Sequence, residues 1–92
     1  MNNLEMLSIL KKDLQMITSA NDEYLEQLLE FAKEAIEREG VKLDGGIECD
    51  MVKIQYAAYL FRKRGGEETS MPRFLRLQLN NMKLGGRKKD DI

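Results

Sequence analysis

The side chains that could do acid–base chemistry in this chain are carboxylates, because the sequence contains no histidine and a single cysteine. Four glutamates recur at the spacing of one helical face: Glu26, Glu30, Glu34 and Glu37. Paired general acid and base work needs a cleft in which both groups reach a substrate. A chain of 92 residues forms one small domain with little surface to spare for such a cleft. The pattern therefore predicts a solvated helix face, and we expect no catalytic residue.

The remaining reactive groups lack the partners that known chemistries need. The absence of histidine removes the usual base near neutral pH and most nucleophile triads. Cys49 has no partner base, so an inert thiol is expected, and one cysteine supplies neither an internal disulfide nor a zinc site. The chain lacks a GxxxxGK[ST] phosphate loop, and the Gly-Gly pairs at 45–46 and 65–66 indicate turns. We expect a reducing compartment and no metal, cofactor or small-molecule substrate.

Charge is divided unevenly along the chain. Residues 1–49 hold 5 Lys/Arg and 11 Asp/Glu, a net charge of −6, whereas residues 50–92 hold 10 Lys/Arg and 5 Asp/Glu, a net charge of +5. One interpretation is a set of helices with solvated faces. Another is a polar molecule whose acidic side meets the basic side of a second copy, or whose basic side meets nucleic acid.

The composition is that of a globular protein, with 42% hydrophobic and 34% charged residues. No apolar run approaches the roughly 20 residues of a membrane span. The first residues, MNNLEMLSILKKDLQ, mix charges into the apolar positions, which is not typical of a signal peptide. Apolar spacing predicts an all-α fold, a single compact helical bundle of about four helices with short loops. Within one domain over 1–92, we expect a folded core over about 4–84 and a frayed, charged tail over 85–92.

The first two helices are predicted from their apolar spacing and caps. The first covers about 4–17, and its apolar face includes Leu7, Leu10, Leu14 and Ile17. The second begins near Asn21 or Asp22, which can cap it, and ends before Gly40, the expected left-handed stop. The glutamates named above hold its outer face.

The third helix is predicted from Glu48 or Asp50 to Arg64. Its last turn carries a basic cluster, which suits the negative end of the helix dipole: Arg62, Lys63 and Arg64. The fourth helix is predicted from Met71 to about Leu84, with Ser70 as a cap and Pro72 in the first turn.

The two faces of the fourth helix differ in character. At 100° per residue, Phe74, Leu75 and Leu79 share an apolar face, and we expect Phe74 and Leu75 to pack against Tyr56 and Tyr59. The opposite face combines cations with two leucines, which is a modest hint of a docking surface beside the alternative of ordinary surface placement: Arg73, Arg76, Asn80, Lys83, Leu77 and Leu84.

The order of these segments resembles the small helical head–tail connector family of tailed bacteriophages and prophages. Three motifs carry the resemblance: an acidic-acidic-x-Leu start of the second helix, a hydrophobic-Tyr-x-x-Arg close of the third, and a proline-led last helix. The matching residues are Asp22, Glu23 and Leu25, then Tyr59 and Arg62, then Pro72, Leu75 and Leu79. The resemblance covers about residues 4–84. The segments 41–49 and 65–70 are shorter than in many members, and longer insertions there tend to carry partner contacts.

The resemblance implies a structural virion protein and no enzyme activity. Such a protein assembles as a ring under the portal, extends the DNA channel and offers a platform for the tail. The implied partners are the portal protein, a tail-side completion protein and further copies of the chain, with DNA close by, no membrane and no small molecule. The implied location is the head–tail junction of the virion, and the host bacterial cytoplasm during assembly.

The charge division suggests which residues would make these contacts. A ring needs two different patches that meet on neighbouring copies. The expected interface residues are Arg73, Arg76, Leu77, Lys83 and Leu84 on one side, and Glu26, Glu30, Glu34 and Glu37 on the other. The basic cluster Arg62, Lys63 and Arg64 is expected to face the DNA channel or a partner.

Two other functions remain open. A short joint before an arginine-bearing helix could belong to a helix-turn-helix DNA-binding regulator of prophage origin. The net charge of −1 and the six-residue joint at 65–70 disfavour it. A small regulator or anti-repressor that binds another protein is the third possibility.

Overall fold

The computed structural model describes the backbone of residues 1–66 and 70–90, and the side chains of residues 1–66 and 70–83. Four α-helices follow one another in this part of the chain: α1 (Asn3–Asp13), α2 (Asp22–Arg38), α3 (Ile47–Arg64) and α4 (Arg73–Asp90). The described residues contain no β-strand, so the predicted all-α fold of four helices is confirmed. None of the helices over these residues combines the length and apolar character that a membrane crossing requires.

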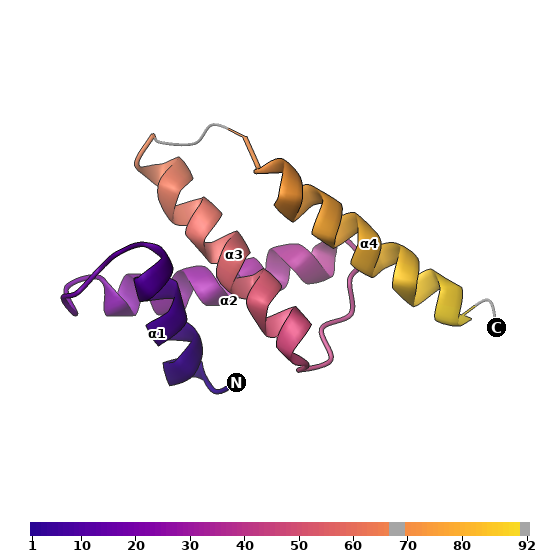
Figure 1. Cartoon of the computed structure of the whole chain (residues 1–92), viewed down its shortest axis with the longest axis horizontal. Helices are drawn as coiled ribbons and strands as arrows, with labels where there is room; N and C mark the ends of the chain where they lie inside the picture. The colour runs from indigo at the N-terminus through magenta and orange to yellow at the C-terminus, as the bar shows by residue number, and fades with distance from the viewer. Residues whose placement is uncertain (67–69, 91–92) are drawn as a thin grey trace.

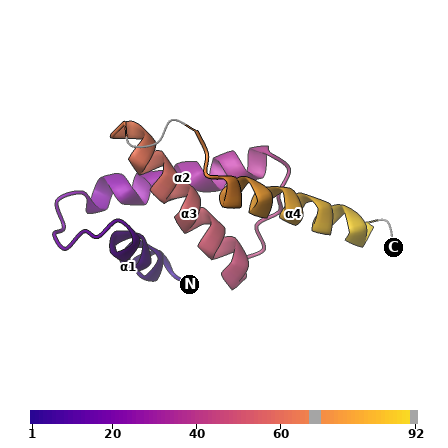
Figure 2. The same ribbon diagram turned by 45° about the horizontal axis from the view of Figure 1, so that its top comes forward.

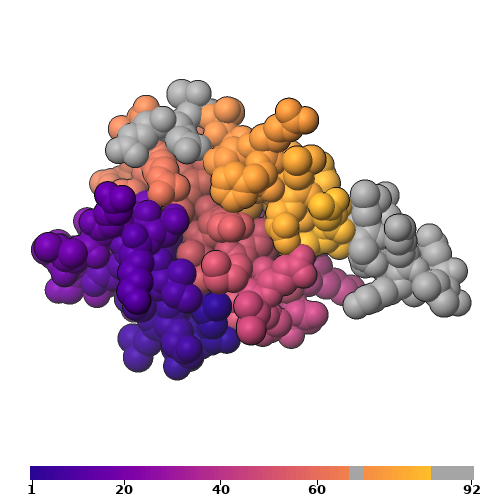
Figure 3. All heavy atoms as spheres, in the orientation of Figure 1, coloured from indigo at the N-terminus to yellow at the C-terminus, as the bar shows by residue number. Residues whose placement is uncertain are grey.

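The helices α2 and α3 cross at the centre of the molecule, with α1 on one side of the crossing and α4 on the other (Figure 1). Turning the molecule by 45° separates α1 from α2, leaves α3 crossing in front of α2, and keeps α4 beside the C-terminal end of α2 (Figure 2). In the space-filling view, α3 is visible as a band between α1 and α4 (Figure 3). The molecule is flattened, with extents of 48 × 29 × 18 Å.

The helix α1 begins with a capping box. The side-chain oxygen of Asn2 accepts a hydrogen bond from the backbone N–H of Glu5 at 2.8 Å, and the Glu5 carboxylate accepts one from the backbone N–H of Asn2 at 3.2 Å. These two bonds satisfy N–H groups that a helix start leaves without partners. They fix the start of α1 close to the predicted position.

The C-terminal end of α1 lies earlier than predicted. The N–H of Gln15 donates to the carbonyl of Lys12 at 3.1 Å, and the N–H of Met16 donates to the carbonyl of Lys11 at 2.8 Å. These are the two bonds of a Schellman motif, which ends a helix. Gln15 occupies its left-handed position with φ of 59°. The predicted continuation to Ile17 is therefore wrong, and the Ile17 side chain is 97% exposed.

The same motif ends α2 where the sequence predicts it. Gly40 takes φ of 98°, which a residue without Cβ adopts at little cost. The N–H of Val41 donates to the carbonyl of Ile36 at 3.4 Å, and the N–H of Gly40 donates to that of Glu37 at 3.0 Å. The predicted apolar face of α2 is also confirmed by its buried residues, which are Leu25, Leu28, Leu29, Ala32 and Ile36.

The helix α3 is the centre of the core. It starts at Ile47, one residue before the earlier of its two predicted starts, and ends at Arg64 as predicted. Tyr59 is buried and Tyr56 is half-buried, and their rings meet edge to face with centroids 6.0 Å apart. The expectation that both tyrosines reach the core is confirmed.

The helix α4 differs from its prediction at both ends. The carbonyl of Pro72 accepts the first helical hydrogen bonds, so the helix starts at Arg73 rather than Met71, and it runs to Asp90 rather than ending at Leu84. The charged tail expected over 85–92 has its side chains outside the described residues. Leu75 and Leu79 are fully buried as predicted, whereas Phe74 is 60% exposed, so its predicted packing against the tyrosines is wrong.

The core has two parts that meet on α3. The α1-side core joins α1, α2 and α3 through ten buried residues: Met6, Leu7, Leu10, Leu25, Leu28, Leu29, Ala32, Ile54, Ala57 and Ala58. The α4-side core joins the end of α2, the following loop, α3 and α4 through six buried residues: Ile36, Val41, Val52, Tyr59, Leu75 and Leu79. Both faces of α3 are therefore covered, one by α1 and α2 and the other by α4 and the C-terminal end of α2.

Candidate protein-interaction surfaces

The acidic face of α2 is the largest predicted surface that the structure leaves open to solvent. We use this name for Glu26, Glu30, Glu34 and Glu37, and all four are exposed. The one ion pair within the described residues that involves them joins Glu34 to Arg38 at 4.0 Å, and both side chains are more than half exposed. The buried residues of α2 face α1, α3 and α4, so the acidic face lies on the outer side of the helix. None of the described cations of residues 50–92 forms an ion pair with it.

The basic end of α3 is tied to the end of α1. The Arg62 guanidinium donates to the backbone carbonyl of Asp13 at 3.3 Å and lies 3.4 Å from its carboxylate. A second pair, Lys11 with Asp22 at 2.9 Å, joins α1 to the start of α2. Arg62 is therefore engaged inside the chain, and its predicted role toward a DNA channel or a partner gains no support from its contacts.

The other two cations of this cluster lie over aromatic rings. The Arg64 guanidinium carbon is 4.8 Å from the ring centroid of Tyr24 on α2, and the Lys63 ammonium is 5.9 Å from that of Tyr59 on its own helix. Cation–π contacts at exposed sites contribute about 0.5–1 kcal/mol. Lys63 and Arg64 remain exposed on their other sides, so a partner can still reach their charge.

The Glu39 cluster joins the C-terminal end of α2 to α4. We use this name for Glu39, Arg76 and Lys83. Arg76 donates to the Glu39 carboxylate at 2.6 Å through one nitrogen and at 3.4 Å through the other, and the Lys83 ammonium lies 3.4 Å away. The hydrogen bond from Arg76, followed by the charges of both cations, lowers the pKa of Glu39 against the opposing effect of burial. The same bond raises the pKa of Arg76.

This cluster changes the meaning of the basic stripe predicted on α4. Arg76 and Lys83 face Glu39 of their own molecule rather than open solvent, and both are half-buried. Arg73 and Leu77 are exposed and remain available to a partner. The side chain of Leu84 lies outside the described residues. The structure therefore separates the predicted α4 surface into an internal contact and a smaller exposed remainder.

A buried carboxylate that sequence reasoning missed lies at the start of α3. Asp50 is 3% exposed and sits 2.9 Å from the α-amino group of Met1 and 3.3 Å from the Lys53 ammonium. The hydrogen bond from the Met1 amine, and then Lys53, lower the pKa of Asp50 although burial opposes this. Both cations that contact Asp50 belong to the same chain, and its ion pair with the Met1 amine joins the start of α3 to the start of α1. Nearby, burial raises the pKa of the Cys49 thiol, which agrees with an inert cysteine.

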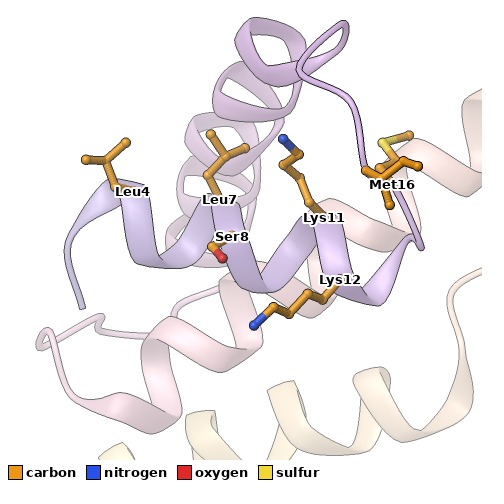
Figure 4. Close-up of a pocket in the computed structure, with 7 residues that line it drawn as sticks. Leu4, Leu7, Ser8, Lys11, Lys12 and Met16 are labelled. Carbon is orange, nitrogen blue, oxygen red and sulfur yellow. The ribbon is translucent and has the colours of Figure 1, made fainter.

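A groove of about 270 Å³ runs along the outer side of α1. We call it the α1 groove. Its apolar lining comes from Leu4, Leu7, Met16 and Ile17, and its polar lining from Ser8, Lys11 and Lys12. Figure 4 shows Leu4, Leu7 and Lys11 along one edge, Ser8 and Lys12 along the other, and Met16 beyond the end of the helix. Because α1 ends at Asp13, the chain turns and brings Met16 and Ile17 back to line the far end of the groove.

One aromatic side chain lies next to the acidic face of α2. Phe31 is 59% exposed, and Glu34 follows it by one helical turn on neighbouring positions of the surface. Aromatic side chains, phenylalanine included, are enriched in protein–protein interfaces relative to the rest of the surface. The spacing of apolar residues in α2 could have identified Phe31 as exposed, because Phe31 falls outside the apolar stripe from which this helix is predicted.

The comparisons with known proteins add nothing to these surfaces. No family model, curated protein or solved structure matches this chain. Within the described residues, no group of three His, Cys, Asp or Glu side chains is arranged to hold a metal ion. What the described surfaces offer chemically is binding: an acidic helix face with one exposed aromatic residue, a groove with lysines at its edge, and a set of cations held at helix ends.

Proposed function

We propose that this chain is a structural protein of the head–tail connector class, which forms a ring under the portal, extends the DNA channel and supports the tail. The proposal starts from the resemblance in the order of its helices. The observation that carries it is the acidic face of α2, which is exposed and forms no ion pair with the described basic residues of α3 and α4. Opposite charge on different surfaces favours head-to-tail contacts between copies over a two-fold dimer.

The internal contacts of the cations also bear on the DNA-binding alternative. A helix-turn-helix protein would place the helix after the joint in the major groove of DNA. In this chain that helix is α4, and its Arg76 and Lys83 are directed at Glu39 of α2. A basic helix with two cations already paired to a carboxylate of its own molecule has less charge available to bind phosphate groups. The connector function is therefore the one we propose.

Self-association of the wild-type chain tests the proposal. Exposed ion pairs contribute about 0.2–1 kcal/mol each and weaken with salt, so assembly is expected at high protein concentration and low ionic strength. Light scattering coupled to size-exclusion chromatography measures the mass, and negative-stain electron microscopy shows whether the assemblies are closed rings. The portal protein is the expected template in the virion.

Binding to short duplex DNA is the control. A connector that lies beside DNA without gripping it gives weak binding with little sequence preference, measured by fluorescence anisotropy across a salt series. Tight, salt-dependent binding of a monomer to duplex DNA, with no assembly at any concentration, would instead identify a DNA-binding regulator. Arg73→Glu is the clean variant of α4 in both assays, because Arg73 has no ion pair among the described residues, whereas Arg76→Glu would break the Glu39 cluster.

A further inference from the structure

The proposed ring needs a surface that accepts the acidic face of α2, and α4 is a poor candidate for it. Two of the three cations predicted there are held in ion pairs by the single carboxylate of Glu39 in the same molecule. Arg73 alone remains exposed without an ion pair within the part of the chain that the structure describes. The acceptor surface is therefore better sought elsewhere.

The α1 groove has the properties that such a surface requires. Leu4 is 73% exposed and Ile17 is 97% exposed, so apolar area lies open at both ends of the groove. Lys12 stands on its edge, is exposed, and has no ion-pair partner among the described residues. A groove that combines apolar residues with a free ammonium at its edge fits an apolar side chain that is followed by a carboxylate.

The chain itself carries a segment with that chemistry. Phe31 projects from α2 with most of its surface in water, and Glu34 lies one turn further along the same side of the helix. Glu30 adds a second carboxylate next to the ring in sequence. An aromatic anchor with flanking charge is typical of residues that dominate the energy of an interface.

We propose that the α1 groove of one copy of this chain takes up Phe31 of a second copy, with Lys12 paired to Glu34. This inference rests on the proposed self-association and names its two surfaces. In Figure 1, α1 lies in front of α2, whereas the acidic face points away from the core. Because the groove is formed by α1 and the residues after it, whereas Phe31 belongs to α2, the contact joins two different surfaces, and it can repeat head to tail from copy to copy. It is small, so it needs high concentration or a template to persist.

The first test compares two phenylalanines of equal exposure. Phe31→Ala and Phe74→Ala each remove one ring, 59% and 60% exposed respectively, so both variants should fold like the wild type. Sedimentation velocity at low salt should show association weakened at least about tenfold by Phe31→Ala and unchanged by Phe74→Ala. Equal effects of the two variants, or none, would overturn the groove contact.

The second test exchanges charges across the contact. Lys12→Glu and Glu34→Lys should each abolish association when the variant is alone, because each creates a pair of like charges. An equimolar mixture of the two should associate again, because every groove then meets a helix of opposite charge. Failure of the mixture to associate would contradict the pairing of Lys12 with Glu34. Circular dichroism of each variant checks that these exposed substitutions leave the fold intact.

The outcomes separate this inference from the proposed function. A wild-type chain that stays monomeric at the highest concentration and lowest salt overturns self-association and the groove contact together. A wild-type chain that forms rings which Arg73→Glu disrupts, while Phe31→Ala and Lys12→Glu do not, overturns the groove contact alone. Loss of assembly in Phe31→Ala with Arg73→Glu unaffected supports both.

Discussion

The α1 side and the α4 side of the central α2–α3 crossing are stabilised to different extents. The α1 side has ten buried residues in its core, and three ion pairs join the ends of its helices to one another. The α4 side has six buried residues within the described part of the chain, and only Leu75 and Leu79 of these come from α4 itself. The Glu39 cluster and a hydrogen bond from Gln78 to Glu48, at 2.8 Å, complete its attachment. We conclude that α4 is the helix whose detachment from the rest of the protein requires the least free energy.

The largest expected effects come from two matched leucines. Leu10 and Leu79 are both fully buried, one in each core, so Leu10→Ala and Leu79→Ala should each lower the free energy of unfolding by about 2–5 kcal/mol. The two variants should differ in which helices unfold locally. Leu10→Ala is expected to weaken protection of amides throughout α1, α2 and α3, whereas Leu79→Ala should release α4 first. Urea unfolding with hydrogen exchange measures both, and an equal loss of protection in α1 and α4 would contradict the difference between the two sides.

Neutralising one carboxylate on each side gives the next largest effect. Asp50→Asn removes a charge that is almost fully buried, and we expect a loss of about 2 kcal/mol, as for hydrogen bonds to charged groups. Glu39→Gln acts on a side chain that is 24% exposed beside a partly exposed Arg76, so a loss of about 0.5–1 kcal/mol is expected. Chemical unfolding at pH 7 measures the two losses. A greater loss in Glu39→Gln would show that the ionic tie of α4 is the stronger one.

The same two carboxylates predict how stability changes with pH. Their pKa values in the folded protein are lowered, by the amine of Met1 and Lys53 for Asp50 and by Arg76 and Lys83 for Glu39. Their contribution is therefore complete above the ordinary carboxyl pKa of about 4 and is lost as the pH falls below it toward the folded pKa values. The urea midpoint should fall over this range. The double variant Asp50→Asn/Glu39→Gln should show a shallower fall, and an unchanged slope would assign the acid sensitivity to other groups.

The smallest expected effect concerns the turn after α1. Gln15 holds the left-handed position that Gly40 holds after α2. A side chain there costs roughly 1–2 kcal/mol, part of which the greater freedom of an unfolded glycine offsets. Gln15→Gly should therefore stabilise the protein by up to about 1 kcal/mol, measured as a rise in the thermal midpoint, and Gly40→Gln should destabilise it. A loss of stability in Gln15→Gly would mean that the glutamine side chain makes a contact that outweighs the strain.

These two turns also show what the sequence could predict of the fold. The spacing of apolar residues predicted the existence of all four helices, and Gly40 marked the end of α2 because glycine is the usual residue at φ above zero. The end of α1 was missed because a glutamine fills the same position, and the apolar period continues by chance through Leu14 to Ile17. For α4, the predicted burial of Leu75 and Leu79 is confirmed and that of Phe74 is wrong. The apolar residues of this helix cover a wider arc of its surface than the face that packs against the core.

The surfaces were less predictable, because charge pairing depends on which helices meet. Spacing alone placed the acidic face of α2 outward, and its glutamates are exposed. It could not show that Glu39 reaches Arg76 and Lys83, which are 37 and 44 residues further along the chain. One signal was present: an acidic residue at the C-terminal end of a helix is unfavourable without a cation nearby. The α1 groove depends on the early end of α1, so it could not be found before that end was known.

The position of Glu39 has a consequence for the order in which the chain folds. Until α4 docks, this carboxylate opposes the dipole of α2, and Ile36, Val41 and Tyr59 lack their cover. Since α4 follows the other helices along the chain, it leaves the ribosome after them, when α1, α2 and α3 can already have met. We expect docking of α4 to be the late step, with truncations at Leu75 and Leu79 speeding unfolding and hardly slowing folding. During that interval the nascent protein exposes these apolar side chains to other molecules, and the docking of α4 covers them.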